Sequence, residues 1–144
     1  MDLSELEKRI TRLEDIEAIK QLKARYCDIC DDLHNPDRIA SVFAEDGIWE
    51  GGKFGQARGH EAIRKLFAGF RDQFSFSQHN IMNPIIAVDG DRATGSWYIV
   101  GPWDDAGENK KIWMTAKYND DYVKVNGEWK YQHLRVEIRF VAER

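Results

Sequence analysis

The hydrophobic period changes part-way along the chain, and this change constrains the fold more than any other feature. Apolar residues recur every three or four positions from Leu3 through Leu13 and on to Tyr26. This spacing predicts one long helix, or two helices joined near Asp15. From residue 78 onward the pattern becomes that of strands. Helices followed by antiparallel strands indicate an α+β fold, most simply one sheet covered by helices on one face.

The second half of the chain is expected to hold four strands and a hairpin. Asn126-Gly127 is a two-residue turn signal, so the register of the last two strands is well specified. Glycine and proline predict loops over 51–59 and 102–109, which are the segments expected to shape the mouth of a cavity. The strands are predicted over residues 78–88, 92–100, 111–125 and 128–141.

Shorter elements are predicted between the first helix and these strands. Pro36 disfavours helix at the residue before it, so the first helix is expected to end near Asp31. Asp37 is expected to cap a short helix over 38–43. A short strand over 48–50 and a helix over 61–70 follow.

Charge and composition exclude several classes of function. The 144 residues carry a formal charge of −4 without a basic stripe, which argues against nucleic-acid binding. No apolar segment approaches the roughly 18 residues of a membrane span. The polar N-terminus is not a secretory signal, so we expect a cytoplasmic protein with residues 1–144 in one domain. Cys27 and Cys30 lie inside a helix without a second pair, and we interpret them as reduced structural thiols.

Aromatic residues make up 12% of the chain, which is rich for a core of this size. A dense aromatic core is one interpretation, and a cavity lined with rings is the other. Trp129, next to the hairpin, is expected to be structural. His34 and His60 are expected in solvated loops, and His133 at a surface. The candidates for substrate binding are Trp49, Phe54, Trp97, Ile99, Trp113 and Tyr118.

Asp31 and His79 form the candidate catalytic pair. Asp31 ends the long helix, and His79 begins the strand region some fifty residues later. If the fold brings them together, the carboxylate can orient the imidazole and stabilise its protonated form. That is the minimum needed to remove a proton from carbon. The alternatives are a solvated aspartate and a histidine of the core or surface.

Six short motifs follow one another along the chain: Y-x-x-x-x-D, F-A-E-D-G, G-H-E-A-I, H-N-x-x-x-P, V-D-G-D-R-A-T-G and N-G-E-W-K. This order resembles the SnoaL-like group of the nuclear transport factor 2-like (cystatin-like cone) superfamily, over nearly the whole chain. The resemblance implies a cone-shaped barrel, in which a curved, mostly antiparallel sheet wraps around the N-terminal helices.

Within this group the chain resembles the bile-acid 7α-dehydratases, and scytalone dehydratases and hexachlorocyclohexane dehydrochlorinases share the Asp–His pair at matching places. The resemblance implies that His79 is the base, that Asp31 orients it and that Tyr26 protonates or holds the leaving oxygen. Tyr26 and Asp31 lie about 140° apart around a straight helix, so both face one cavity only if the helix end unwinds or the cavity is wide.

The sequence also departs from these relatives. The resemblance implies that Trp97, Ile99 and Gly101 face inward, and Gly101 replaces the aspartate of the bile-acid enzymes. We expect this glycine to leave room for substrate. The buried arginine of the relatives falls near apolar positions, and Arg135 and Arg139 are each one residue out of register.

The function implied is a lyase of the dehydratase type, a carbon–oxygen lyase without metal or organic cofactor, that acts on a small hydrophobic polycyclic or aromatic substrate. Three other reactions begin with the same base: a retro-aldol release of a small aldehyde such as formaldehyde, an isomerisation and a polyketide cyclisation. A non-catalytic ligand-binding or oligomerisation domain is the alternative of a different class. Apolar and charged residues alternate over 130–143, so a homo-oligomer, either a trimer or a dimer, is expected.

Overall fold

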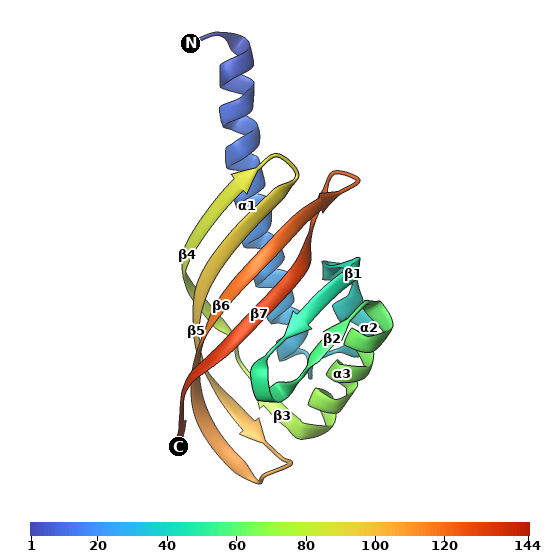
Figure 1. Ribbon diagram of the computed structural model, residues 1–144. Coiled ribbons are helices and arrows are strands. Elements are labelled where there is room, and N and C mark those ends of the chain that lie inside the picture. The colour runs from blue at the N-terminus through green and yellow to red at the C-terminus, as the bar shows by residue number, and fades with distance from the viewer.

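The computed structural model describes all 144 residues. The N-terminal apolar residues with helical spacing all lie in one uninterrupted helix, α1 (Leu3–Asp31) (Figure 1). Asp2 caps it by accepting a hydrogen bond from the backbone N–H of Glu5 at 2.8 Å. Asp15 does not join two helices. Its carboxylate instead accepts a hydrogen bond from Trp129 Nε1 at 2.9 Å, so Trp129 is structural as predicted.

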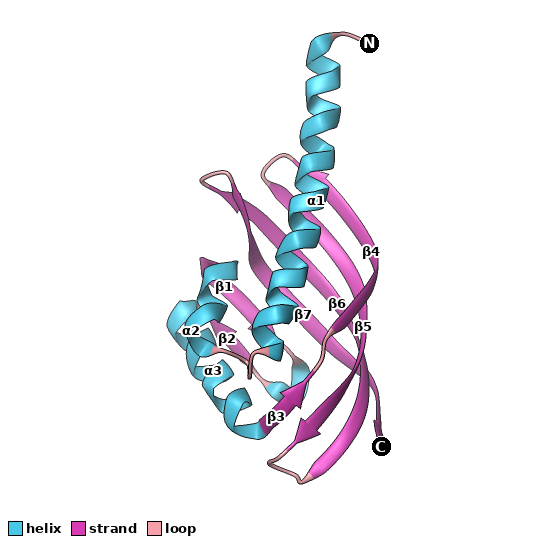
Figure 2. Ribbon diagram, turned by 180° about the vertical axis from the view of Figure 1, so that it is seen from behind, coloured by secondary structure: helices cyan, strands magenta, loops and turns pink.

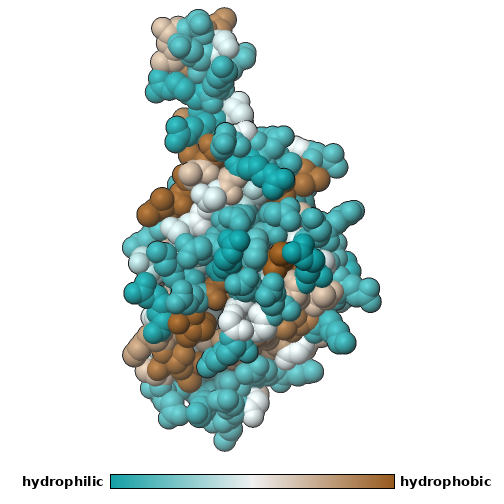
Figure 3. Space-filling model, in the orientation of Figure 1, coloured by the Kyte–Doolittle hydropathy of each residue, from teal (hydrophilic) through white to brown (hydrophobic).

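The first half of α1 projects from the body of the protein (Figures 1 and 3). Every residue from 1 to 14 is exposed, including the apolar Leu3, Leu6, Ile10 and Leu13. Burial begins at Asp15, and from there the apolar face of the helix lies against the sheet. None of the helices has both the length and the apolarity needed to span a membrane.

Short elements connect α1 to the long strands. They are α2 (Pro36–Ile39), the 3₁₀ turn η1 (Ala40–Val42), β1 (Phe43–Glu50), the 3₁₀ turn η2 (Gly52–Phe54), β2 (Gln56–Arg58) and α3 (His60–Gln73). The predicted cap at Asp37 is wrong. The side chain of Asn35 caps α2 instead, because Pro36 occupies the first helical position, where its missing N–H costs nothing.

Each of the four predicted strands extends beyond at least one of its predicted ends. They are β4 (Asn80–Asp89), β5 (Arg92–Asp105), β6 (Lys110–Val125) and β7 (Glu128–Glu143), and a short strand that was not predicted, β3 (Phe74–Ser77), precedes them. The strand predicted from residue 78 begins at Asn80 instead, because Gln78 and His79 form a connection between β3 and β4. The loop predicted over 102–109 is wrong in its first half, since β5 continues through Pro102. The Asn126-Gly127 hairpin is confirmed, with both residues in the left-handed region.

The seven strands form one curved sheet, and α1 lies along its concave face (Figure 2). The strand order is β2-β1-β7-β6-β5-β3, with β4 also paired to β5. Only β1 and β7 are parallel. The predicted mostly antiparallel, cone-like sheet around the N-terminal helix is therefore confirmed, although the sheet does not close. Helices α2 and α3 cover the end where α1 terminates (Figure 2).

A buried ion pair ties α1 to the sheet. Lys23 Nζ lies 2.8 Å from Asp120 Oδ2, and both side chains are at most 1% exposed. The ammonium group also lies 3.3 Å from the ring centroid of Tyr118. Tyr122 donates to the same carboxylate oxygen at 2.9 Å, and Trp97 Nε1 donates to the Tyr122 hydroxyl at 3.0 Å. This network fixes the position of the helix against β5 and β6.

Candidate active site

Asp31 and His79, 48 positions apart in sequence, are in direct contact. Asp31 is the last residue of α1, and His79 belongs to the connection between β3 and β4. His79 Nδ1 lies 2.6 Å from Asp31 Oδ1. The backbone N–H of His79 donates to Asp31 Oδ1 at 3.1 Å and Oδ2 at 3.0 Å. Ser77 Oγ donates to Asp31 Oδ1 at 3.2 Å.

This geometry sets the chemistry that the imidazole can perform. When Nδ1 carries the proton and donates it to Asp31, the lone pair is on Nε2. The Asp31 carboxylate at Nδ1 fixes both the tautomer and the orientation of the ring. It also stabilises the imidazolium that forms when Nε2 accepts a proton. The His79 side chain is only 6% exposed, so its orientation is further fixed by packing.

His79 lines a cavity between the concave face of the sheet and the end of α1. The cavity has a volume of about 50 Å³ in this structure. That is well below the roughly 300–1,000 Å³ of typical small-molecule sites, so a substrate with rings requires the lining side chains to move apart. The only lining side chains with polar atoms that can exchange protons are His79, His34, Tyr26 and Tyr118, and no lysine, arginine or carboxylate lines the wall. Aromatic rings form most of the remainder, among them Trp49, Phe54, Phe67, Phe70, Phe74 and Trp103.

Four of the six predicted substrate-binding residues line this cavity: Trp49, Phe54, Ile99 and Tyr118. Trp97 and Trp113 lie elsewhere. Trp97 faces inward as predicted, but it lies nearer the start of β5 than the cavity residues Ile99 and Trp103, and it donates to the Tyr122 hydroxyl there. Trp113 is 45% exposed, because the inward positions of β6 are the even-numbered ones from Ile112 to Tyr118.

Gly101 does not leave room for substrate as expected. A Cβ atom at this position would lie 1.8 Å from the backbone carbonyl oxygen of Gln78. The glycine therefore admits the connection between β3 and β4 next to β5. Since this connection carries His79, Gly101 helps to position the candidate base rather than the ligand.

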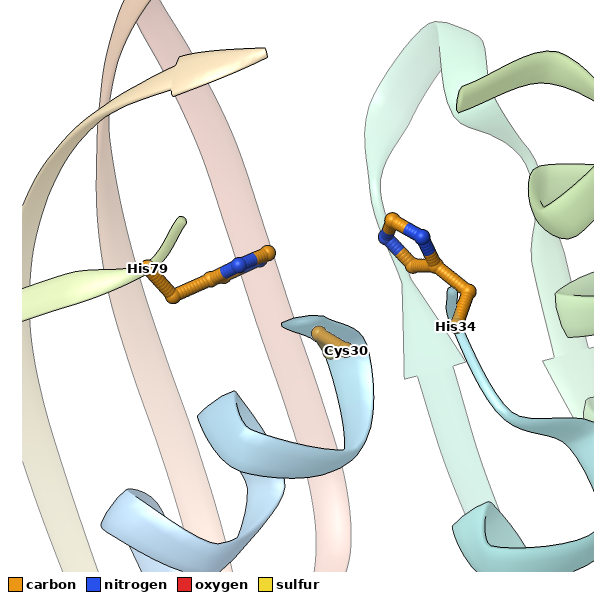
Figure 4. A group of neighbouring side chains, drawn as sticks. All are labelled: Cys30, His34 and His79. Carbon is orange, nitrogen blue, oxygen red and sulfur yellow. The ribbon is translucent and has the colours of Figure 1, made fainter. Parts of the chain in front are cut away.

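His34 is buried in the cavity wall, so the expectation of a solvated residue is wrong. Leu33 and His34 both adopt left-handed backbone conformations, with φ of 52° and 48°. This turn lies directly after α1 and directs the His34 ring inward, where it faces His79 with 6.1 Å between ring centroids (Figure 4). Burial is the main cause that lowers the pKa of His34 to about 3, and nearby His79 adds to it. His60 is also not solvated, since its Nε2 lies 2.8 Å from the Phe43 carbonyl oxygen.

Tyr26 lies inside the same cavity, one and a half turns before Asp31. Its hydroxyl accepts a hydrogen bond from Trp49 Nε1 at 2.9 Å. Burial raises the pKa of this phenol well above its usual value, so the hydroxyl keeps its proton. Asp31 itself does not line the cavity. Tyr26 and Asp31 therefore do not need to face the same cavity. Asp31 lies outside it and contacts His79, and the His79 ring lines the cavity beside Tyr26.

The two arginines considered as anion-stabilising groups lie outside the cavity. Arg139 is the extra residue of a bulge in β7, opposite Thr115 and Ala116 of β6. Its guanidinium group lies 5.5 Å from the ring centroid of Tyr98, which is on the outer face. Arg135 donates to Asp121 at 2.9 Å and contacts His133. A bulge is therefore present in β7, but it does not place the Arg139 guanidinium group beside the Asp31–His79 pair.

Both cysteines are free and buried, as expected of structural thiols. Burial raises the pKa of Cys27 to about 12 and that of Cys30 well above its usual value. Neither thiol has the low pKa of a redox-active C-x-x-C pair.

The comparison with protein families agrees with this architecture. A model of the SnoaL-like domain matches residues 11–135 of the chain. The chain belongs to the SnoaL-like domain family. The match spans α1 from its third turn through the centre of β7, so it includes both members of the Asp31–His79 pair.

Solved structures with this SnoaL-like fold include proteins named for elimination reactions. Hexachlorocyclohexane dehydrochlorinase LinA-type3 from Novosphingobium barchaimii LL02 is 21% identical, with a TM-score of 0.86 over 94% of each chain. A candidate scytalone dehydratase from Novosphingobium aromaticivorans DSM 12444 is 23% identical, with a TM-score of 0.84 over 94% of this chain and 91% of that one. An NTF2-like protein with a cystatin-like fold from Novosphingobium aromaticivorans is 22% identical, with a TM-score of 0.74 over 95% and 90%. These similarities establish a shared fold.

Proposed function

We propose that this SnoaL-like protein is a cofactor-independent lyase that eliminates water from a hydrophobic aromatic or polycyclic small molecule. The observation that carries the proposal is the 2.6 Å contact between His79 Nδ1 and Asp31, which leaves Nε2 as a proton acceptor in an aromatic cavity. Two structural relatives named for eliminations support the reaction type.

In the proposed mechanism, His79 Nε2 removes a proton from a carbon next to an activating group. Asp31 stabilises the resulting imidazolium. The electrons of the C–H bond form the new double bond as the C–O bond breaks, and the Tyr26 hydroxyl protonates the departing oxygen to give water. The imidazolium then returns its proton to the Tyr26 phenolate. Each positioned acid or base contributes roughly 10²- to 10⁴-fold in rate.

The cavity wall favours an uncharged substrate with flat rings. Trp49, Phe54, Phe70 and Trp103 offer apolar faces and edges on several sides. The absence of ionised side chains from the lining disfavours a charged substrate, which would lose its hydration without gaining a partner. The neutral imidazole of His34 and the hydroxyl of Tyr118 are the further groups available to hold a substrate oxygen.

A His79→Ala variant tests the proposal. Purified protein is offered hydroxylated steroids and aromatic dimers, and the product mass is measured. The wild type should release the mass of water, and the variant should lose turnover while it keeps its affinity for the substrate. A variant that turns over at the wild-type rate would exclude His79 as the base. A wild type that binds the compounds without changing their mass would support a binding module or an isomerase.

A retro-aldol-type lyase is the second candidate, because no arginine or carboxylate lines the cavity to assist a departing hydroxide. In this reaction His79 takes the hydroxyl proton of a CH₂OH group, and the C–C bond breaks to release formaldehyde. The imidazolium then returns the proton to the carbanion that is left. A product lighter by formaldehyde rather than water distinguishes this reaction from dehydration.

We also propose self-association through the outer face of the sheet. Tyr98, Trp113 and Phe140 are large apolar residues between 37% and 57% exposed on the outward positions of β5, β6 and β7. Figure 3 shows apolar side chains gathered toward the lower end of this face. A second copy of the chain is the expected occupant, and sedimentation equilibrium should give a dimer or trimer that Phe140→Lys dissociates. A wild-type monomer at all concentrations would contradict this.

A further inference from the structure

Three potential metal ligands meet at the end of α1. Cys30 belongs to the last turn of the helix, His34 to the turn that follows, and His79 to the β3–β4 connection. Each offers one ligand atom, and these atoms all lie within 4.8 Å of one another. Figure 4 shows the two rings approaching from opposite sides, with Cys30 between them.

His34 has a hydrogen-bonding capacity that the protein does not use. The His34 side chain packs among Phe67, Phe70 and Phe74, and the residue is 6% exposed. Its Nδ1 atom is fully buried without any hydrogen-bond partner. Buried polar atoms in proteins are nearly always satisfied, so an unsatisfied nitrogen at this depth is unusual. The ring that carries it lies beside a thiol and a second imidazole, and one ligand atom of each of the three side chains is within 4.8 Å of the others.

His79 is already arranged as a metal-binding histidine. Metal-ligating histidines usually donate their other ring N–H to a carboxylate, which fixes the ring and raises its basicity. Asp31 provides this contact to His79 Nδ1 at 2.6 Å, and Nε2 remains for the metal. The carboxylate is itself held by Ser77 and by the His79 backbone.

The donor set selects the class of cation. A thiolate and two imidazoles suit Zn²⁺ and Co²⁺, whereas Mg²⁺ and Ca²⁺ prefer oxygen ligands. With metal–ligand bonds of about 2.0–2.3 Å, tetrahedral ligand atoms lie within about 4 Å of one another. The three side chains therefore need to close by only about 1 Å. A fourth position faces the cavity, since His34 and His79 both line it.

We propose that Cys30, His34 and His79 bind one divalent cation of the Zn²⁺ type per chain. Binding displaces the proton of the Cys30 thiol, because the thiolate is the ligand. The consequence for activity rests on the proposed function: a cation on Nε2 takes the lone pair that would accept the substrate proton. Zinc and proton abstraction at His79 are then mutually exclusive, and zinc inhibits the lyase.

Titration of the purified, metal-free full chain with Co²⁺ tests the site without any substrate. The expected result is a thiolate-to-cobalt charge-transfer band that saturates at one Co²⁺ per chain, and that Zn²⁺ abolishes by displacement. The Cys30→Ser variant should lose the band. The Cys27→Ser variant is the matched control, since Cys27 is also a buried thiol, one turn earlier and outside the cluster, and it should keep the band.

His34→Phe provides a second test that retains a ring among the three phenylalanines. It should weaken Co²⁺ binding by at least about tenfold, as expected for loss of a direct ligand. A wild type without the band, or a band that survives in Cys30→Ser, would overturn the proposal. The readout is spectroscopic, so cation binding without any lyase activity would refute only the proposed function. Lyase activity without the band would refute only the cation site.

Discussion

Asp31 holds His79 by its backbone and its side chain at once: the two carboxylate oxygens accept the His79 amide at 3.1 and 3.0 Å, and Oδ1 also contacts Nδ1 at 2.6 Å. Asp31→Asn keeps the shape of the side chain but removes the charge that selects the tautomer. We expect turnover to fall by roughly 10²- to 10⁴-fold. Steady-state kinetics with fluorescence-measured substrate affinity check this. An unchanged rate would show that the carboxylate does not support the base.

Tyr26→Phe separates a structural role from a chemical one. The hydroxyl is the acceptor for the buried Trp49 Nε1, so its loss should lower the free energy of unfolding by about 1–3 kcal/mol. Well below the unfolding temperature the variant is folded, so a fall in turnover there reflects loss of the proton donor and not unfolding. We expect such a fall. Retention of full activity by the folded variant would remove Tyr26 from the role of proton donor.

Lys23→Met should be among the most destabilising substitutions that keep the volume of the side chain. It leaves the Asp120 carboxylate buried without its partner at 2.8 Å. Breaking one half of a buried pair costs about 3–5 kcal/mol. Urea unfolding followed by tryptophan fluorescence measures this loss. A change below about 1 kcal/mol, the usual size for exposed pairs, would mean that the pair is hydrated.

His34 makes stability depend on acidity. Its pKa is about 3 in the folded chain, against an ordinary value near 6.5, so below about pH 6.5 the unfolded chain binds a proton that the folded chain does not. Stability is therefore lost as the pH falls from about 6.5 toward 3, by up to about 1.4 kcal/mol per pH unit. Unfolding free energies of the wild type and His34→Phe should diverge with this slope. Parallel curves would contradict the assignment.

The two cysteines should be hidden from thiol reagents. Burial raises the pKa of Cys27 to about 12 and that of Cys30 well above its usual value, and thiolate is the reactive form. Because both folded pKa values exceed the unfolded ones, stability is lost as the pH rises above the unfolded thiol pKa of about 8.5. Ellman's reagent should modify both thiols in urea and neither in the native protein. Fast native labelling would indicate that the end of α1 opens.

The parts of the fold that the sequence predicts are those set by local pattern. The period from Leu3 to Tyr26 continues without a break, and α1 forms there. Asn126-Gly127 adopts the backbone conformation that its residue types favour. Asp31 and His79 can be predicted as site residues because they lie in motifs that the chain shares with the SnoaL-like family. The Asp31–His79 contact itself spans 48 positions, and no local pattern determines it.

Trp113 and Tyr118 show an error that the sequence alone exposes. They are five residues apart on one strand, so they point to opposite faces and cannot both line one cavity without a bulge between them. β6 pairs with β5 without interruption over this stretch. Tyr118 is inward, and Trp113 is therefore outward. Trp103 shares the inward face with Ile99, but the sequence does not predict this because Pro102 indicates the end of the strand.

His34 was beyond prediction for a different reason. Its inward position depends on two successive left-handed residues, Leu33 and His34, and leucine rarely adopts that region. A glycine or asparagine at position 33 would have marked such a turn. Gly101 is similar, since its requirement comes from the carbonyl of Gln78 on a neighbouring segment.

The exposed half of α1 has a practical consequence for handling the protein. The helix has 29 residues, so its first residue lies about 40 Å along the axis from the last turn, where Asp31 contacts His79. In Figure 2 the N-terminus projects away from the end that α2 and α3 cover. A fluorophore, affinity tag or surface tether attached there would stay clear of arriving ligands, so immobilised or labelled protein should report the same binding as free protein.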